Sequence, residues 1–109
     1  MLGRAGHLQG IEATSNKLGL RSIIHEAKTW GVEWQKEGRW VVGDGGRVWT
    51  SAGVTAGMDM VAAWLKAKKA EGGLEVDARL MGLVFSLLEF TPREREDGVF
   101  GHLWEGMEL

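Results

Sequence analysis

Apolar residues recur along the chain with two periods, one typical of helices and one typical of strands. Between residues 20 and 27 they fall at i, i+3, i+4 and i+7, which predicts one apolar face of a helix. Ser15 or Asn16 can cap this helix at its start, and Gly31 can end it. Short apolar runs at 11–14 and 32–34 predict two strands on either side.

The clearest local signal is a β-hairpin. Residues 39–42 and 47–50 are rich in β-branched and aromatic side chains, and Gly-Asp-Gly-Gly joins them. An Asp-Gly pair supplies the positive φ angles that a tight hairpin turn needs. Trp40 and Trp49 lie on the two arms, so we expect them to pack across the strands.

Two longer helices are expected in the second half of the chain. One follows the hairpin and ends at Gly72-Gly73, and the other runs from about Leu74 to Phe90, where Pro92 prevents its continuation. The expected buried positions are Met58, Val61, Ala62 and Leu65 in the first helix, and Val76, Leu80, Leu83, Val84, Leu87 and Leu88 in the second. We expect the tail at 92–109 to be irregular.

Helices and strands alternate over residues 1–109, which predicts a single α/β unit without repeats or a linker. The strands are too few for a complete doubly wound sheet. Residues 1–10 have helical spacing but are interrupted by glycines, so we expect them to depend on a larger domain. A partial sheet leaves apolar helix faces and a strand edge uncovered, and such surfaces recruit partners.

Composition narrows the classes of function. The chain has thirteen Lys and Arg and fifteen Asp and Glu, which gives a net charge of −2. It has no long run of basic residues of the kind that binds nucleic acid or an anionic membrane. No apolar run approaches the roughly 18 residues of a membrane span, and no signal-peptide pattern opens the chain, so we expect a cytoplasmic protein. The chain has no cysteine, which excludes disulfides, cysteine-ligated zinc and a cysteine nucleophile supplied by these residues.

Other candidate chemistry receives little support. The histidines, His7, His25 and His102, have no metal-ligand spacing, so we expect no metal and no other cofactor. The alternating charges at 93–97 are typical of a solvated surface segment. The six tryptophans lack the basic groove of single-strand binders, which favours a packing role for them.

The segment from Thr50 to Asp59 combines a strand end with small residues that lead into a helix. The free N–H groups at the start of such a helix can bind an anion, and the hydroxyls of Thr50, Ser51 and Thr55 can add hydrogen bonds. The alternative is that glycine only permits a tight turn. The segment is neither a Walker loop nor a Gly-x-Gly-x-x-Gly motif, and both interpretations stay open.

The same segment resembles a signature of the ThiJ/PfpI family, in the class I glutamine-amidotransferase-like superfamily. Residues 48–60, VWTSAGVTAGMDM, are similar to the family stretch TSAGVSAGID, and the likeness is nearest to the isonitrile-hydratase-like branch. Further pieces resemble the family in the same order, at residues 2–10, 13–17, 39–42, 88–90 and 97–101.

This resemblance implies the C-terminal half of a flavodoxin-like three-layer sandwich with a β-hairpin. The family's cysteine nucleophile and its acidic helper precede the part that residue 1 matches, so the resemblance implies a truncated chain that is inactive alone. It implies a pocket wall for a small-molecule ligand made by Asn16, where many members have a histidine, and by Thr50, Ser51, Ala52, Gly53 and Val54.

Two functions follow as expectations. The first is a truncated ThiJ/PfpI-like protein related to isonitrile hydratases, in the small-molecule hydratase or hydrolase class. The second is a non-catalytic interaction or dimerisation module that retains this part of the fold, as a homodimer or with a complementing partner chain.

Overall fold

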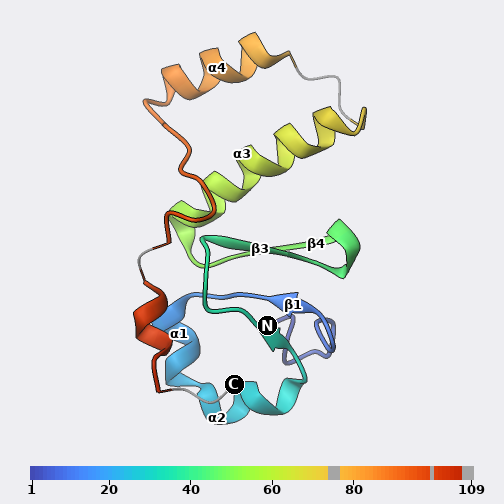
Figure 1. The fold of residues 1–109 in the computed structure, drawn as a ribbon, viewed down its shortest axis with the longest axis vertical. Helices are drawn as coiled ribbons and strands as arrows, with labels where there is room; N and C mark the ends of the chain where they lie inside the picture. The colour runs from blue at the N-terminus through green and yellow to red at the C-terminus, as the bar shows by residue number, and fades with distance from the viewer. Residues whose placement is uncertain (74–76, 99, 107–109) are drawn as a thin grey trace.

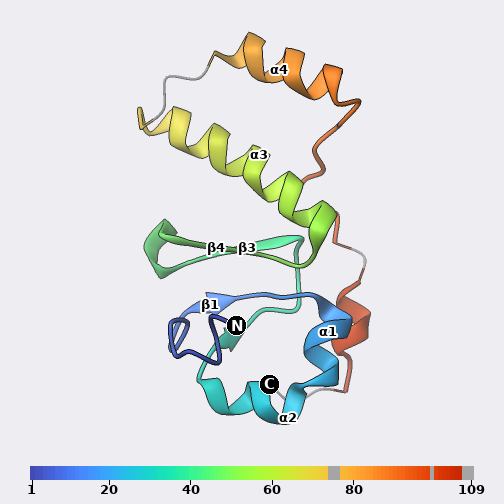
Figure 2. The same cartoon turned by 180° about the vertical axis from the view of Figure 1, so that it is seen from behind.

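The computed structural model describes residues 1–73, 77–98 and 100–106 and has a mixed α/β fold. Figure 1 shows three levels along the long axis: helices α3 and α4, then the hairpin of β3 and β4, then β1 with α1 and α2. The view from behind in Figure 2 has the same order. The elements are β1 (Glu12–Ala13), α1 (Lys17–Ser22), α2 (Ile24–Ala27), η1 (Lys28–Trp30), β2 (Glu33–Trp34), β3 (Trp40–Gly43), η2 (Asp44–Gly46), β4 (Val48–Ser51), α3 (Val54–Ala70), α4 (Ala78–Leu87) and η3 (Gly101–Trp104).

The predicted hairpin is confirmed. Strands β3 and β4 pair antiparallel, and the turn between them has positive φ at Asp44 and at the two glycines that follow. The register places Trp40 opposite Ser51 and Trp49 opposite Val42. The two tryptophans are therefore diagonal neighbours on the two strands and are not directly opposite each other.

A second small sheet lies against the hairpin. Strands β1 and β2 pair in parallel, and the hairpin packs on β1. Gly43 is needed at this contact, because an added Cβ would clash with the backbone oxygen of Glu12. The Thr14 amide donates a 2.9 Å hydrogen bond to Thr50 Oγ1, which ties the two sheets together.

The hydrophobic core is centred on Trp104, a residue of the tail that we expected to be irregular. Its side chain is fully buried with Leu20 and Ala27, and its ring contacts Trp34 edge-on at a centroid distance of 6.4 Å. The indole Nε1 donates a 2.9 Å hydrogen bond to the backbone oxygen of Lys17. The tail therefore closes the core through the short helix η3.

The helix expected around residues 20–27 is present in two pieces. Asn16 caps α1, because its Oδ1 accepts a 2.8 Å hydrogen bond from the amide of Gly19, and Gly31 ends the segment at φ 68°. Ile23 leaves helical geometry, at φ −122° and ψ 25°, and separates α1 from α2. Ile23 is exposed, so the single apolar face predicted for residues 20–27 is interrupted there. Residues 2–10 form turns instead of a helix.

The buried stripes predicted for the two long helices are largely exposed. In α3 the buried residues are Ala56, Asp59 and Ala62, whereas Met58 and Val61 are about half exposed. Helix α4 has no buried residue at all. Its expected core positions Leu80, Leu83, Val84 and Leu87, and Leu88 just after it, are exposed because no described part of the chain covers them. Val76 lies outside the described residues.

Among the described residues, no helix has both the length and the apolar character that crossing a membrane requires.

Candidate functional site

A pocket of about 370 Å³ lies where the start of α1, the turn from β4 into α3, and the C-terminal tail meet. Small and apolar residues make most of its wall, with a few cationic side chains among them. The lining residues are Asn16, Lys17, Leu18, Lys36, Gly38, Arg39, Ala52, Gly53, Val54, Thr55, Ala56, Gly98, Phe100, Gly101 and Leu103.

The structure brings four of the six predicted pocket residues to this lining: Asn16, Ala52, Gly53 and Val54. The other two, Thr50 and Ser51, do not line it. Thr50 Oγ1 instead accepts the hydrogen bond from the Thr14 amide, and Ser51 Oγ donates to the backbone oxygen of Gly53 at 3.3 Å. These two hydroxyls therefore hold the strand and the turn beside the pocket.

Asn16 and Gly53 lie close together in the predicted pocket wall. A Cβ added at Gly53 would lie 3.8 Å from Asn16 Nδ2, so the two residues face each other at close range. Asn16 Oδ1 is already used in capping α1. Its amide nitrogen is the end of the side chain that lies nearest Gly53, and an amide nitrogen is a hydrogen-bond donor.

Helix α3 begins at this wall without a side-chain cap. Gly53 is the capping residue, and its backbone is extended with φ 170°. The first N–H groups of a helix have no acceptor within the helix, and they carry its partial positive charge. The pocket therefore has backbone donors at the start of α3 beside Thr55 and Ala56.

Cationic groups add to these donors. Lys17, Lys36 and Arg39 line the pocket, and no carboxylate or imidazole is among the described lining residues. Burial lowers the pKa of Lys17 to about 8, although the nearby Glu37 carboxylate acts in the opposite direction. Lys17 Nζ donates to Thr14 Oγ1 at 2.8 Å and to the Gln35 carbonyl at 3.3 Å, and it lies 4.3 Å from the Trp104 ring centroid.

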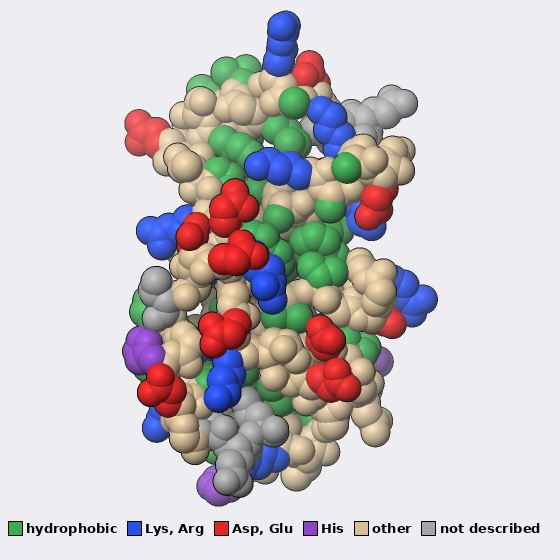
Figure 3. All heavy atoms as spheres, in the orientation of Figure 1, with side chains coloured by type: hydrophobic (Ala, Val, Ile, Leu, Met, Phe, Trp, Pro, Cys, Tyr) green, Lys and Arg blue, Asp and Glu red, His purple; other side chains and the backbone are tan. Residues whose placement is uncertain are grey.

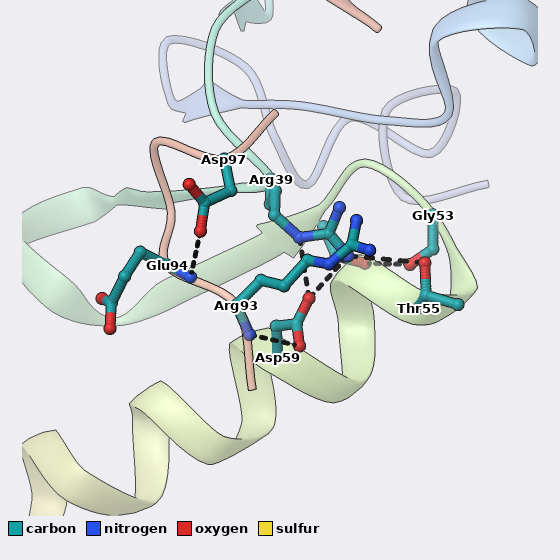
Figure 4. A network of polar contacts seen from close by, with 8 residues as sticks. Arg39, Gly53, Thr55, Asp59, Arg93, Glu94 and Asp97 are labelled. Carbon is teal, nitrogen blue, oxygen red and sulfur yellow. Dashed lines mark hydrogen bonds and ion pairs between the residues drawn. The ribbon is translucent and has the colours of Figure 1, made fainter. Parts of the chain in front are cut away.

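Arg39 is held in place by a buried ion pair. Its Nε donates to Asp59 Oδ2 at 2.7 Å, and its Nη2 contacts the same oxygen at 2.5 Å (Figure 4). Nη2 also donates to Thr55 Oγ1 at 3.4 Å, beside the pocket. Spacing along the sequence does not predict this pair. The one local signal is that Asp59 lies between Ala56 and Ala62, on the face of α3 that is buried.

The tail is fastened to the same network. The Arg93 amide donates to Asp59 Oδ1 at 3.0 Å (Figure 4). Arg39 donates its own amide to the Arg95 carbonyl at 2.8 Å. Arg95 Nε donates in turn to the Trp40 carbonyl at 2.9 Å. The charged segment at 93–97, which we expected to be only solvated surface, therefore also places the tail over the pocket.

The described groups of the pocket can bind and orient a molecule that accepts hydrogen bonds. In the described part of the chain, no three His, Asp or Glu side chains lie close enough together to hold a metal ion. The three histidines are exposed and do not line the pocket.

Comparison of the chain with protein-family models, curated proteins and solved structures finds no match. The resemblance to the ThiJ/PfpI family therefore rests on residues of the sequence itself.

Proposed function

We propose that this chain is a ThiJ/PfpI-like module related to isonitrile hydratases, the C-terminal half of a flavodoxin-like sandwich, that binds a small molecule and has no hydratase activity alone. The observation that carries the proposal is the pocket between Asn16 and the turn at 52–54. These residues come from distant parts of the sequence, and they are the positions that the family resemblance selects.

The size and polarity of the pocket support binding. Small-molecule sites have volumes of about 300–1,000 Å³ and combine apolar walls with a few convergent polar groups. This pocket has about 370 Å³, with Leu18, Val54 and Phe100 as apolar lining and the Asn16 amide as a donor. A small organic molecule with a hydrogen-bond-accepting carbonyl, carboxylate or nitrile group matches these features.

The residues that line the pocket cannot carry out the thiol chemistry of the family. The family reaction depends on an activated cysteine thiolate, and the sequence has no cysteine. The donors at Asn16 and at the start of α3 can orient a carbonyl oxygen or stabilise a developing negative charge on it. They cannot begin the reaction, so the proposed role of this chain is to hold the ligand.

A matched pair of variants tests this proposal. Val54 lines the pocket and Val61 does not, although both are exposed valines on the same helix. A mixture of small carboxylic acids, amides and nitriles is screened by ligand-observed NMR against the wild type, Val54→Trp and Val61→Trp. We expect saturable binding that Val54→Trp abolishes and Val61→Trp preserves. No saturable binding by any compound, or binding that survives Val54→Trp, would overturn the proposal.

A further inference from the structure

The guanidinium of Arg39 has donors that its ion pair leaves free. Arg39 is only 6% exposed, and it lines the pocket. Its Nε and Nη2 atoms contact Asp59 and Thr55, whereas no described residue accepts a hydrogen bond from Nη1. Every buried side-chain nitrogen of the described residues has a partner, so Nη1 is not a buried atom and reaches solvent. The pocket is the space beside this group, because Thr55, which Nη2 contacts, is part of the lining.

The position of this guanidinium is fixed before any ligand binds. The Arg39 amide donates to the Arg95 carbonyl at 2.8 Å, and the Arg39 carbonyl accepts from the Ala52 amide at 2.9 Å. Asp59 holds two of the three guanidinium nitrogens. A side chain that is already ordered loses little conformational entropy on binding, and a guanidinium is well suited to bind an anionic group. Nη1 is therefore a preorganised cationic donor at the edge of the pocket.

The charges around the pocket match a ligand with one negative charge. The pocket lining contains three cationic side chains, those of Lys17, Lys36 and Arg39. Two carboxylates lie just behind the lining. Asp59 is bound to Arg39, and the Glu37 carboxylate oxygens are 3.6 Å from the position of a Cβ added at Gly101. The cations therefore exceed the carboxylates by one charge, and Lys17 still carries its charge at pH 7 because its pKa is about 8.

The protein as a whole does not attract anions. Its net charge is −2, and on the face shown in Figure 3 the basic and acidic side chains are intermixed. Interactions between exposed charges are also screened by salt over about 10 Å. A preference for an acid over its neutral amide would therefore originate within the pocket.

We propose that the pocket selects small organic acids and that Arg39 Nη1 binds their carboxylate. The apolar lining at Leu18, Val54 and Phe100 holds the rest of the molecule. A phosphate monoester fits less well, because it carries nearly two negative charges at neutral pH. This inference rests on the proposed function, since the pocket is the same, and it narrows the ligand from any hydrogen-bond acceptor to a carboxylate.

Matched ligands test this selection on the full chain without any substitution. Butanoic, 3-methylbutanoic and benzoic acids are each titrated at pH 7 beside the primary amide and the nitrile of the same skeleton, with phenyl phosphate as a fourth probe. We expect an acid to bind about 10-fold or more tightly than its amide, because a charged hydrogen bond is stronger than a neutral one. Added sodium chloride should weaken the acid and not the amide.

The outcomes separate this inference from the proposed function. An amide that binds as tightly as its acid, or phenyl phosphate that binds more tightly than benzoate, would overturn the selection of carboxylates and leave the small-molecule site intact. No saturable binding by any of these compounds would overturn both.

A charge-balanced double variant tests the role of Arg39. Arg39→Met/Asp59→Leu removes both charges of the buried pair, so the net charge is unchanged and no unpaired buried charge remains. The acid should lose about 10-fold or more in affinity, whereas the amide should keep its affinity and so show that the pocket is intact. The control Lys68→Gln/Glu71→Gln removes the exposed ion pair of α3 and should leave both affinities unchanged. An acid that binds the Arg39 variant as tightly as the wild type, or that weakens equally in the control, would contradict the assignment.

Discussion

Arg39 and Asp59 form a buried ion pair that joins the start of β3 to the first turns of α3. The side chains are only 6% and 3% exposed, and Arg39 Nε lies 2.7 Å from Asp59 Oδ2. The other carboxylate oxygen of Asp59 accepts the Arg93 amide. One carboxylate therefore connects the residue before β3, helix α3 and the tail, and each of these contributes residues to the pocket lining.

Removal of one partner of this pair should destabilise the protein strongly. Asp59→Ala leaves the buried Arg39 guanidinium without its counter-charge, which costs about 3–5 kcal/mol of the free energy of unfolding. Urea denaturation followed by tryptophan fluorescence measures the loss. The double variant Arg39→Met/Asp59→Leu should recover most of the stability, because no buried charge then remains.

The exposed pair of Lys68 and Glu71 is the control for this experiment. Glu71→Ala should change the free energy of unfolding by less than about 1 kcal/mol, since surface ion pairs contribute little. An equal loss of the free energy of unfolding from Asp59→Ala and Glu71→Ala would show that the buried pair stabilises the protein no more than the exposed pair does.

The stability of the protein should depend on pH through Lys17. Its pKa is about 8 in the folded state, below the ordinary value of 10.5, so between these values the unfolded chain holds a proton that the folded chain has lost. The free energy of unfolding should therefore rise with pH across this window, by up to about 1.4 kcal/mol per pH unit. Below pH 8 Lys17 is protonated in the folded and unfolded states, and burial of its charge lowers the free energy of unfolding.

Urea denaturation of the wild type and Lys17→Met from pH 7 to pH 10 isolates this contribution. The wild type should gain stability relative to Lys17→Met as the pH rises above 8. Parallel stability profiles for the two proteins would mean that Lys17 has the same pKa in the folded and unfolded chains.

Asn16 should contribute to stability as a helix cap. Asn16→Ala removes the acceptor of the Gly19 amide and should cost about 1 kcal/mol, whereas Asn16→Asp keeps the acceptor and should cost much less. Thermal unfolding followed by circular dichroism compares the two variants. An equal loss of stability in both would contradict the capping role and would attribute the effect to the amide nitrogen on the pocket side.

Two glycine substitutions should have opposite effects. Gly43→Ala brings a Cβ against the Glu12 backbone oxygen and Ile11 Cγ2, and should destabilise the protein by about 1–3 kcal/mol. Gly82→Ala meets no atom within 4 Å and lies inside α4, where alanine favours the helix by up to about 1 kcal/mol. Equal melting temperatures for the two variants would argue against the close packing of the hairpin on β1.

The parts of the fold that the sequence predicts correctly depend on neighbouring residues. The Asp-Gly turn of the hairpin, the Asn16 cap and the stop at Gly31 each follow from conformational preferences within a few positions. The break at Ile23 has no such local signal. Periodicity alone therefore predicts one helix where the structure has two.

The features that could not be predicted from the sequence join residues that lie far apart in the chain. Trp104 bonds to Lys17, and Arg39 pairs with Asp59, so neither contact can be found from spacing. In the pocket, Asn16 and the turn at 52–54 were selected by resemblance, whereas Lys36 and Phe100 reach it only through the folded arrangement. The apolar stripe predicted for α4 is present on the helix, but the spacing of apolar residues does not specify which surface covers them.

The most direct test of the proposed function is to map a bound ligand onto the backbone by NMR. The strongest compound from the fragment screen is titrated into ¹⁵N-labelled protein, and the amide chemical shifts are followed. We expect saturable shifts at Asn16, Gly53 and Val54, with the amides of α4 unchanged. Shifts confined to α4 or to the cavity between α3 and α4, with none at Asn16 and Gly53, would contradict the proposed function.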